Sequence, residues 1–177
     1  MANQRLTDKT ALEEQTGSGD LYMIVDVSDT SSSAQGTSKK LDSKFVIQTD
    51  KFSLSNAEVL ALDTTPKVLV GALSGYMITP ISATVLVTHA SPDESSNKNL
   101  LFGWDDTQDS LYWDYGSRFF GAESVDVSYV FGGNQPGGGV CEGSLLNKSF
   151  KMWASSTGFN GGWRCDVYLT YCYTKVL

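Results

Sequence analysis

Residues 165–173 read CDVYLTYCY, and this stretch decides the fold class of the chain. Apolar or aromatic side chains recur at every second position from Cys165 to Tyr173. The positions between them are Asp166, Tyr168, Thr170 and Cys172. Successive side chains of a strand point to opposite faces, so a period of two predicts a strand with one buried face. The run is the longest of its kind in the sequence, and we expect it to form a strand of an antiparallel sheet.

Two earlier stretches alternate in the same way. In residues 81–88 apolar side chains alternate with Ser and Thr, and Pro80 marks the start or a bulge of that strand. In residues 125–131 Val, Tyr and Phe alternate with Asp126 and Ser128. Short alternating runs separated by Gly, Ser, Asn and Asp, without a long helix, are typical of all-β domains. The sequence therefore predicts a mostly-β fold, with an antiparallel β-sandwich or jelly-roll-like domain over residues 51–177.

The stretch 57–62 is ambiguous. Ser55 and Glu58 have capping-box spacing, which is typical of a helix start, but Pro66 with the polar residues before it leaves little room for a helix. We expect a strand here.

Residues 1–50 have a different organisation. Thr10 and Glu13 also have capping-box spacing, which predicts a short helix over Thr10–Gln15 that Gly17 ends. The apolar run 20–27 and the apolar return 40–47 enclose a small, polar stretch, so we expect a hairpin. Two strands alone are marginally stable in water. We expect this helix-plus-hairpin segment to be an anchor that packs against another surface.

Composition excludes several classes of partner. The chain has 177 residues, 41% of them hydrophobic, and a net charge of −7, so it should fold and should repel polyanions. Nucleic-acid binding needs clustered basic residues, and the one adjacent basic pair is Lys39-Lys40. No apolar run approaches the roughly 20 residues that span a bilayer. We expect neither a nucleic-acid nor a membrane partner.

Cysteine usage indicates a reducing compartment. The three cysteines are Cys141, Cys165 and Cys172, an odd number without a C-x-x-C motif. Cys165 and Cys172 are seven residues apart in one expected strand, which places them on opposite faces. With no signal peptide at the start of the sequence, we expect synthesis and assembly in a cytoplasm.

No catalytic motif stands out. The single histidine, His89, follows an expected strand without a recognisable nucleophile motif, so a structural role is favoured. The glycine-rich stretch 132–139 lacks the Lys-Ser/Thr of a phosphate-binding loop and is interpreted as a plain loop. We expect the chain not to be an enzyme, and we expect no cofactor.

Acidic residues gather at Asp105, Asp106, Asp109 and Asp114. Converging carboxylates can bind calcium, but the spacing does not match an EF-hand, and a solvated turn is the favoured interpretation. We therefore expect no metal. Asp105 and Asp114 could also form the carboxylate pair of a glycoside hydrolase, an alternative that no motif marks.

Aromatic residues are dense between positions 104 and 120. If buried, they form one end of the core, which is the favoured interpretation. If exposed, Trp104 and Trp113 would provide a surface for a sugar or a protein.

Two stretches resemble a known class of proteins. The order of residues 6–12, 19–29 and 36–41 resembles the N-terminal virion-attachment segments of tailed-bacteriophage fibre and head-decoration proteins. Residues 59–76 look like the opening of a β-sandwich domain found in small phage virion proteins. The resemblance covers about half of the chain, and residues 90–177 match nothing we can name.

The resemblance implies a structural role. The expected protein is a head fibre or capsid decoration of a tailed bacteriophage, on the outer surface of the virion, bound to capsid or other virion proteins and homotrimeric. The alternative is a tail-associated fibre protein that binds a receptor or a host surface glycan. In either case the segment 20–47 would dock through the apolar side chains of Ile24, Val25, Phe45 and Ile47.

Overall fold

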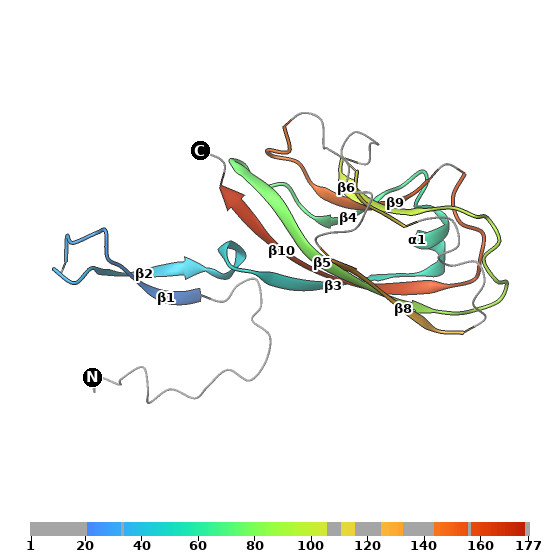
Figure 1. Ribbon diagram of the computed structural model, residues 1–177, viewed down its shortest axis with the longest axis horizontal. Helices are drawn as coiled ribbons and strands as arrows, with labels where there is room; N and C mark the ends of the chain where they lie inside the picture. Colours follow the sequence, from blue (N-terminus) through green and yellow to red (C-terminus); the bar gives the residue numbers. More distant parts are fainter. Residues whose placement is uncertain are drawn as a thin grey trace. The chain divides into compact units, whose positions relative to one another are not determined.

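The computed structural model describes residues 21–32, 34–105, 111–115, 125–132, 144–155 and 157–175. Their secondary structure is mostly antiparallel β (Figure 1). The chain divides into two compact units, residues 1–44 and residues 45–177. The helix expected over Thr10–Gln15 lies outside the described residues.

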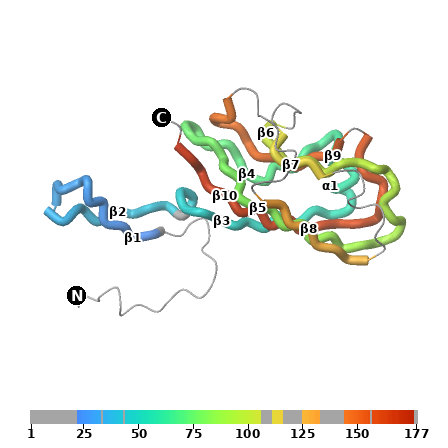
Figure 2. The backbone as a smooth tube through the Cα atoms, in the orientation of Figure 1, coloured from blue at the N-terminus to red at the C-terminus, as the bar shows by residue number. Residues whose placement is uncertain are grey.

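The first unit contains one hairpin, in blue tones in Figure 2. Strand β1 (Leu21–Asp26) pairs antiparallel with β2 (Thr37–Asp42), and a 3₁₀ turn, Ser43–Phe45, follows. The hairpin is confirmed, but its second strand covers Thr37–Asp42 rather than the expected residues 40–47. Backbone pairing explains the difference, because the ladder between Asp26 and Thr37 forms regardless of side-chain polarity.

The described residues of the second unit form eight strands in two four-stranded sheets, ordered β3-β10-β5-β8 and β4-β9-β6-β7. The strands are β3 (Gln48–Leu54), β4 (Lys67–Val70), β5 (Tyr76–Thr88), β6 (Leu100–Trp104), β7 (Leu111–Tyr115), β8 (Val127–Gly132), β9 (Phe150–Ala154) and β10 (Arg164–Lys175). Every pairing between neighbours is antiparallel.

Four of these pairings are nested along the chain. The innermost pair is β6 with β7; around it, β5 pairs with β8, β4 with β9 and β3 with β10. Successive pairs of this series alternate between the two sheets. The second unit thus has the connectivity of one long hairpin whose successive strand pairs belong alternately to the two sheets.

The predicted alternation in β10 is confirmed. Cys165, Val167, Leu169 and Tyr171 are buried, whereas the residues between them are partly exposed. Cys165 therefore points inward and Cys172 outward, and both are free thiols. Side chains from both four-stranded sheets form a single hydrophobic cluster. Full burial of an aliphatic side chain such as Leu169 is worth about 1.5–3 kcal/mol.

The strand expected over residues 57–62 is wrong. Residues Asn56–Leu60 form the helix α1, which begins at a complete capping box. The Ser55 N–H donates to Glu58 Oε2 at 2.9 Å, and the Glu58 N–H donates back to Ser55 Oγ at 3.4 Å. Only Val59 of the helix residues is buried. The helix is therefore stabilised mainly by this one apolar contact and by its N-terminal cap. Within the described ranges, no helix is both long and apolar enough to cross a membrane.

Candidate functional site

The hairpin of the first unit presents apolar side chains on both faces. In β1, Tyr22 and Ile24 lie on one face, opposite Leu41 and Lys39 of β2. Met23 and Val25 lie on the other face, opposite Lys40 and Ser38. A sheet with one solvated face normally alternates apolar and polar side chains, and β1 departs from that pattern.

These apolar side chains are exposed. Ile24 is 39% exposed and Val25 57%, and the residues that sequence reasoning did not single out are more exposed still, at 65% for Met23 and 75% for Val27. Exposed apolar side chains gathered on one short element are typical of a place where another surface binds. We call Tyr22, Met23, Ile24 and Val25 of β1, together with Val27 in the turn after Asp26, the apolar strand of the hairpin. The period-two pattern alone could not identify Met23 and Val27. It assigns side chains to one face of a strand or the other, but it does not tell whether other residues pack against that face.

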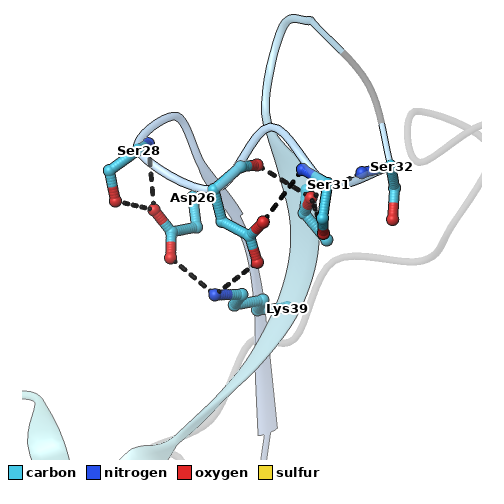
Figure 3. Close-up of polar contacts among 7 residues, drawn as sticks. Asp26, Ser28, Ser31, Ser32 and Lys39 are labelled. Atoms are coloured by element: carbon cyan, nitrogen blue, oxygen red, sulfur yellow. Dashed lines mark hydrogen bonds and ion pairs between the residues drawn. The ribbon is translucent and has the colours of Figure 1, made fainter.

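The tip of the hairpin is fixed by a polar network (Figure 3). Lys39 Nζ lies 2.7 Å from Asp26 Oδ2 and 2.9 Å from Asp29 Oδ2. Asp26 Oδ1 accepts from the Ser28 N–H and hydroxyl, and Asp29 Oδ1 accepts from the Ser31 N–H, so each aspartate also shapes its own turn. The hydrogen bond from Lys39 is the largest cause that lowers the pKa of Asp26 to about 2 and the pKa of Asp29 further. Both carboxylates are therefore ionised at neutral pH.

Gly36 is required where the chain re-enters β2. Its φ is +113°, and an added Cβ would lie 2.7 Å from the Asp26 carbonyl oxygen and 2.9 Å from Val25 Cγ1. Only glycine fits this approach without displacing the backbone of β1. The tip therefore has a defined shape that holds the apolar strand in an extended conformation.

The four residues expected to attach the chain are divided between the two units. Ile24 and Val25 belong to the first unit, and Phe45 and Ile47 to the second. The Phe45 ring stacks on the Tyr76 ring with centroids 5.3 Å apart, so it already has a partner inside its own unit. Ile47 is 67% exposed. Of these four, Ile24, Val25 and Ile47 offer exposed surface, and Ile24 and Val25 belong to a continuous apolar strand.

Trp104 and Trp113 do not form a surface. They are 3% and 1% exposed and belong to the hydrophobic cluster of the second unit. The Trp104 ring packs edge-on against Phe150, and Trp113 Nε1 donates to the Gly132 carbonyl oxygen at 3.1 Å. A ligand surface built on these two indole rings is therefore not present, because the core covers them.

His89 helps to hold a loop at the end of β5. Its ring Nε2 lies 2.7 Å from Asp93 Oδ1, and its backbone N–H donates to Asp126 Oδ1 at 2.8 Å. Asp93 is well exposed, so this pairing contributes about 0–1 kcal/mol. The contacts give His89 a positioning role between two loops.

The acidic residues that the structure describes have separate partners. Asp105 Oδ2 lies 2.6 Å from Lys148 Nζ, and Asp114 Oδ1 accepts from Asn99 Nδ2 at 2.8 Å. Asp106 and Asp109 lie outside the described residues. Among the residues with a described placement, no three His, Cys, Asp or Glu side chains converge as metal ligands.

Glu94 is a buried carboxylate that the sequence did not reveal. It is 4% exposed and accepts hydrogen bonds from the backbone N–H groups of Ser96, Asn160 and Gly161 and from Trp163 Nε1. Burial acts to raise its pKa, but the donors from Ser96, Trp163 and Gly161 outweigh burial and hold the pKa below the ordinary value. Because three of these four donors come from residues 160–163, no local pattern could have identified the site.

Sequence comparison adds no identification. No protein family matches the chain, and no curated protein matches it.

Proposed function

We propose that the chain is a non-enzymatic structural protein of a tailed-bacteriophage virion, a head fibre or capsid decoration. The hairpin of the first unit attaches it to capsid or other virion proteins, and the second unit is displayed on the outer surface of the particle after assembly in the host cytoplasm. The observation that carries this proposal is the apolar strand, which is exposed on both faces of the hairpin.

Burial of that strand would supply binding energy. Transfer of Ile24 and Val25 from water into a protein contact is worth about 1.5–3 kcal/mol each when burial is complete. The polar network at the tip adds to this by pre-organising the hairpin, since Lys39 and the two aspartates lose little freedom on docking. An apolar strand on a pre-shaped support suits strand addition or insertion into a groove of another protein.

The sequence resemblance supports the same assignment. Residues 19–29 and 36–41, which resemble virion-attachment segments, contain all of β1 and all of β2 except Asp42. Five of the exposed large apolar residues, Tyr22, Met23, Ile24, Val25 and Val27, therefore lie in the part of the chain that resembles an attachment segment.

The second unit is proposed to be a jelly-roll sandwich. Its eight strands, with nested pairs distributed over two sheets, have the connectivity expected when one long hairpin is rolled up, and the shared hydrophobic cluster fits two sheets packed face to face. Jelly rolls are frequent in viral capsid and lectin domains. The resemblance further implies a homotrimer, for which sedimentation equilibrium should give three times the 19.2 kDa chain mass.

The test is retention on virions. Particles would be purified from cells that supply either the natural chain or the double variant Ile24→Asp, Val25→Asp, and the bound chain would be measured on a gel. Buried, uncompensated charge costs several kcal/mol, so the double variant should be absent from particles while its second unit stays folded. The matched control is Val68→Asp, an exposed apolar residue of β4, which should remain bound. Normal occupancy by the double variant would refute attachment through the hairpin.

A further inference from the structure

A groove with a mixed polar and apolar lining lies at one end of the strands β3, β10 and β5 in the second unit. It consists of two hollows of about 370 Å³ and about 290 Å³ that share the lining residues Ser55, Thr88 and Arg164. The larger hollow extends to Ser53 and Asp166, and the smaller extends to His89. The two hollows adjoin each other at these residues, and we call them together the groove.

Arg164 occupies the shared wall. It is exposed at the start of β10, opposite Thr88 of β5. Within the described part of the chain, its guanidinium makes no ion pair or side-chain hydrogen bond, although its charge helps to lower the pKa of Asp166. A guanidinium offers five donors in a fixed plane, so Arg164 can donate to a ligand without first losing a partner.

An outward row of side chains continues from the groove along β10. Arg164, Asp166 and Tyr168 share the face of the strand that points away from the core. Alternate residues of a strand are about 7 Å apart, so the row spans about 14 Å. Neighbouring strands widen it, with Ser53 and Lys51 of β3 opposite Asp166 and Tyr168.

The row is organised by its own contacts. The Ser53 hydroxyl donates to Asp166 Oδ1 at 2.6 Å, and Lys51 Nζ lies 2.9 Å from Asp166 Oδ2. The same Lys51 Nζ lies 5.6 Å from the centroid of the Tyr168 ring. Asp166 is thereby held in one orientation beside an aromatic ring that is only partly covered.

The chemistry of this surface selects a class of ligand. Its cations, Arg164 and Lys51, are offset by Asp166 and by a chain of net charge −7, so an anionic ligand gains little. The lining of the groove mixes hydroxyl and charged groups with apolar ones such as Leu54 and Ala90, so a purely apolar ligand would leave its polar groups unpaired. A polyhydroxyl ligand satisfies both the donors and the acceptors, and its C–H face can pack on an aromatic ring.

We propose that the groove and the row beside it bind a neutral saccharide chain, with Arg164 and Asp166 hydrogen-bonding to sugar hydroxyl groups in the groove and Tyr168, outside the groove, packing against a further sugar ring. The 14 Å row is long enough for a short oligosaccharide rather than a single sugar. The site lies entirely in the second unit and uses no hairpin residue, so it stands or falls independently of virion attachment.

The full chain would be applied to a microarray of neutral and acidic saccharides, and the strongest neutral binder would be titrated by calorimetry. Tyr168→Ala and Arg164→Ala should each weaken binding on the order of tenfold. The matched control is Lys175→Ala, which removes an exposed cation from the other end of β10 and should leave affinity unchanged. Circular dichroism would verify the fold of each variant. The proposal is overturned by the absence of any neutral binder, by binding confined to acidic saccharides, or by unchanged affinity in both Tyr168→Ala and Arg164→Ala.

Discussion

Ile24 and Val25 are adjacent in β1 but lie on opposite faces of the hairpin, Ile24 across from Lys39 and Val25 across from Ser38. One covering surface can therefore bury only one of the two side chains. A partner that buries both must enclose the hairpin, as a groove or a pair of elements does.

Single substitutions separate these arrangements. If the hairpin is enclosed, Ile24→Asp and Val25→Asp should each lower the fraction of chain bound to purified virions, because either variant places a charge in a dry contact. The bound fraction on a gel is the measurement. Release by only one of the two variants would show that docking uses a single face.

The second unit should fold without the first. A fragment of residues 45–177 contains every strand of both four-stranded sheets, and we expect cooperative unfolding in urea, whereas residues 1–44 should show no stable structure. A fragment that begins at Lys51 removes Asp50, which accepts the Tyr171 hydroxyl at 2.8 Å, and Thr49, which pairs with Thr170. It should be less stable than 45–177 by about 1–3 kcal/mol. Equal urea midpoints for the two fragments would contradict this.

Replacement of Glu94 should destabilise the second unit and change its pH dependence. Glu94→Gln removes the charge and places an amide N–H₂ group near N–H groups that can only donate. The free energy of unfolding should fall by about 1–3 kcal/mol at neutral pH. Because the folded-state pKa is lowered, the contribution of Glu94 is present above its ordinary value of 4.5 and is lost as pH falls below it. Urea unfolding at a series of pH values should show this acid-side loss in the natural chain and a smaller one in the variant. Parallel pH profiles for the two chains would exclude the role.

Lys39 should set the ionisation of the hairpin tip. In Lys39→Met, the pKa of Asp26 should rise from about 2 toward 3.8, because the largest cause of its depression is removed. Carboxyl chemical shifts followed through an acid titration by NMR would measure it. Lys40→Met provides the control, since Lys40 is on the other face of β2 opposite Met23. An Asp26 titration unchanged by Lys39→Met would disprove the pairing.

Alternation revealed the strands that have one buried and one solvated face. In β10 the buried set from Cys165 to Tyr171 is the set that the sequence predicted, and Pro80 lies at the bulge where the register of β5 and β10 shifts. These features follow from local rules, because side-chain direction in a strand has a fixed period and proline cannot donate to a ladder.

Burial from more than one side leaves no such pattern. All five residues of β6, from Leu100 to Trp104, are buried, so the segment shows no alternation, and the location of Trp104 could not be decided from sequence. At α1 the local signal was present in Ser55 and Glu58, but the brevity of the segment favoured the wrong interpretation. For Glu94 the deciding contacts come from distant residues, which one sequence does not reveal.

The place of β10 has a consequence for how the protein is made. It is the last of the described strands along the chain, yet it lies between β3 and β5 in the middle of its sheet. During synthesis β3 has no neighbour in its sheet until residues 165–171 leave the ribosome, and its edge stays open until then. Closure across more than a hundred residues also makes folding slow. The nascent chain therefore needs protection from premature aggregation until residues 165–171 have emerged, because only then can the sheet β3-β10-β5-β8 be completed.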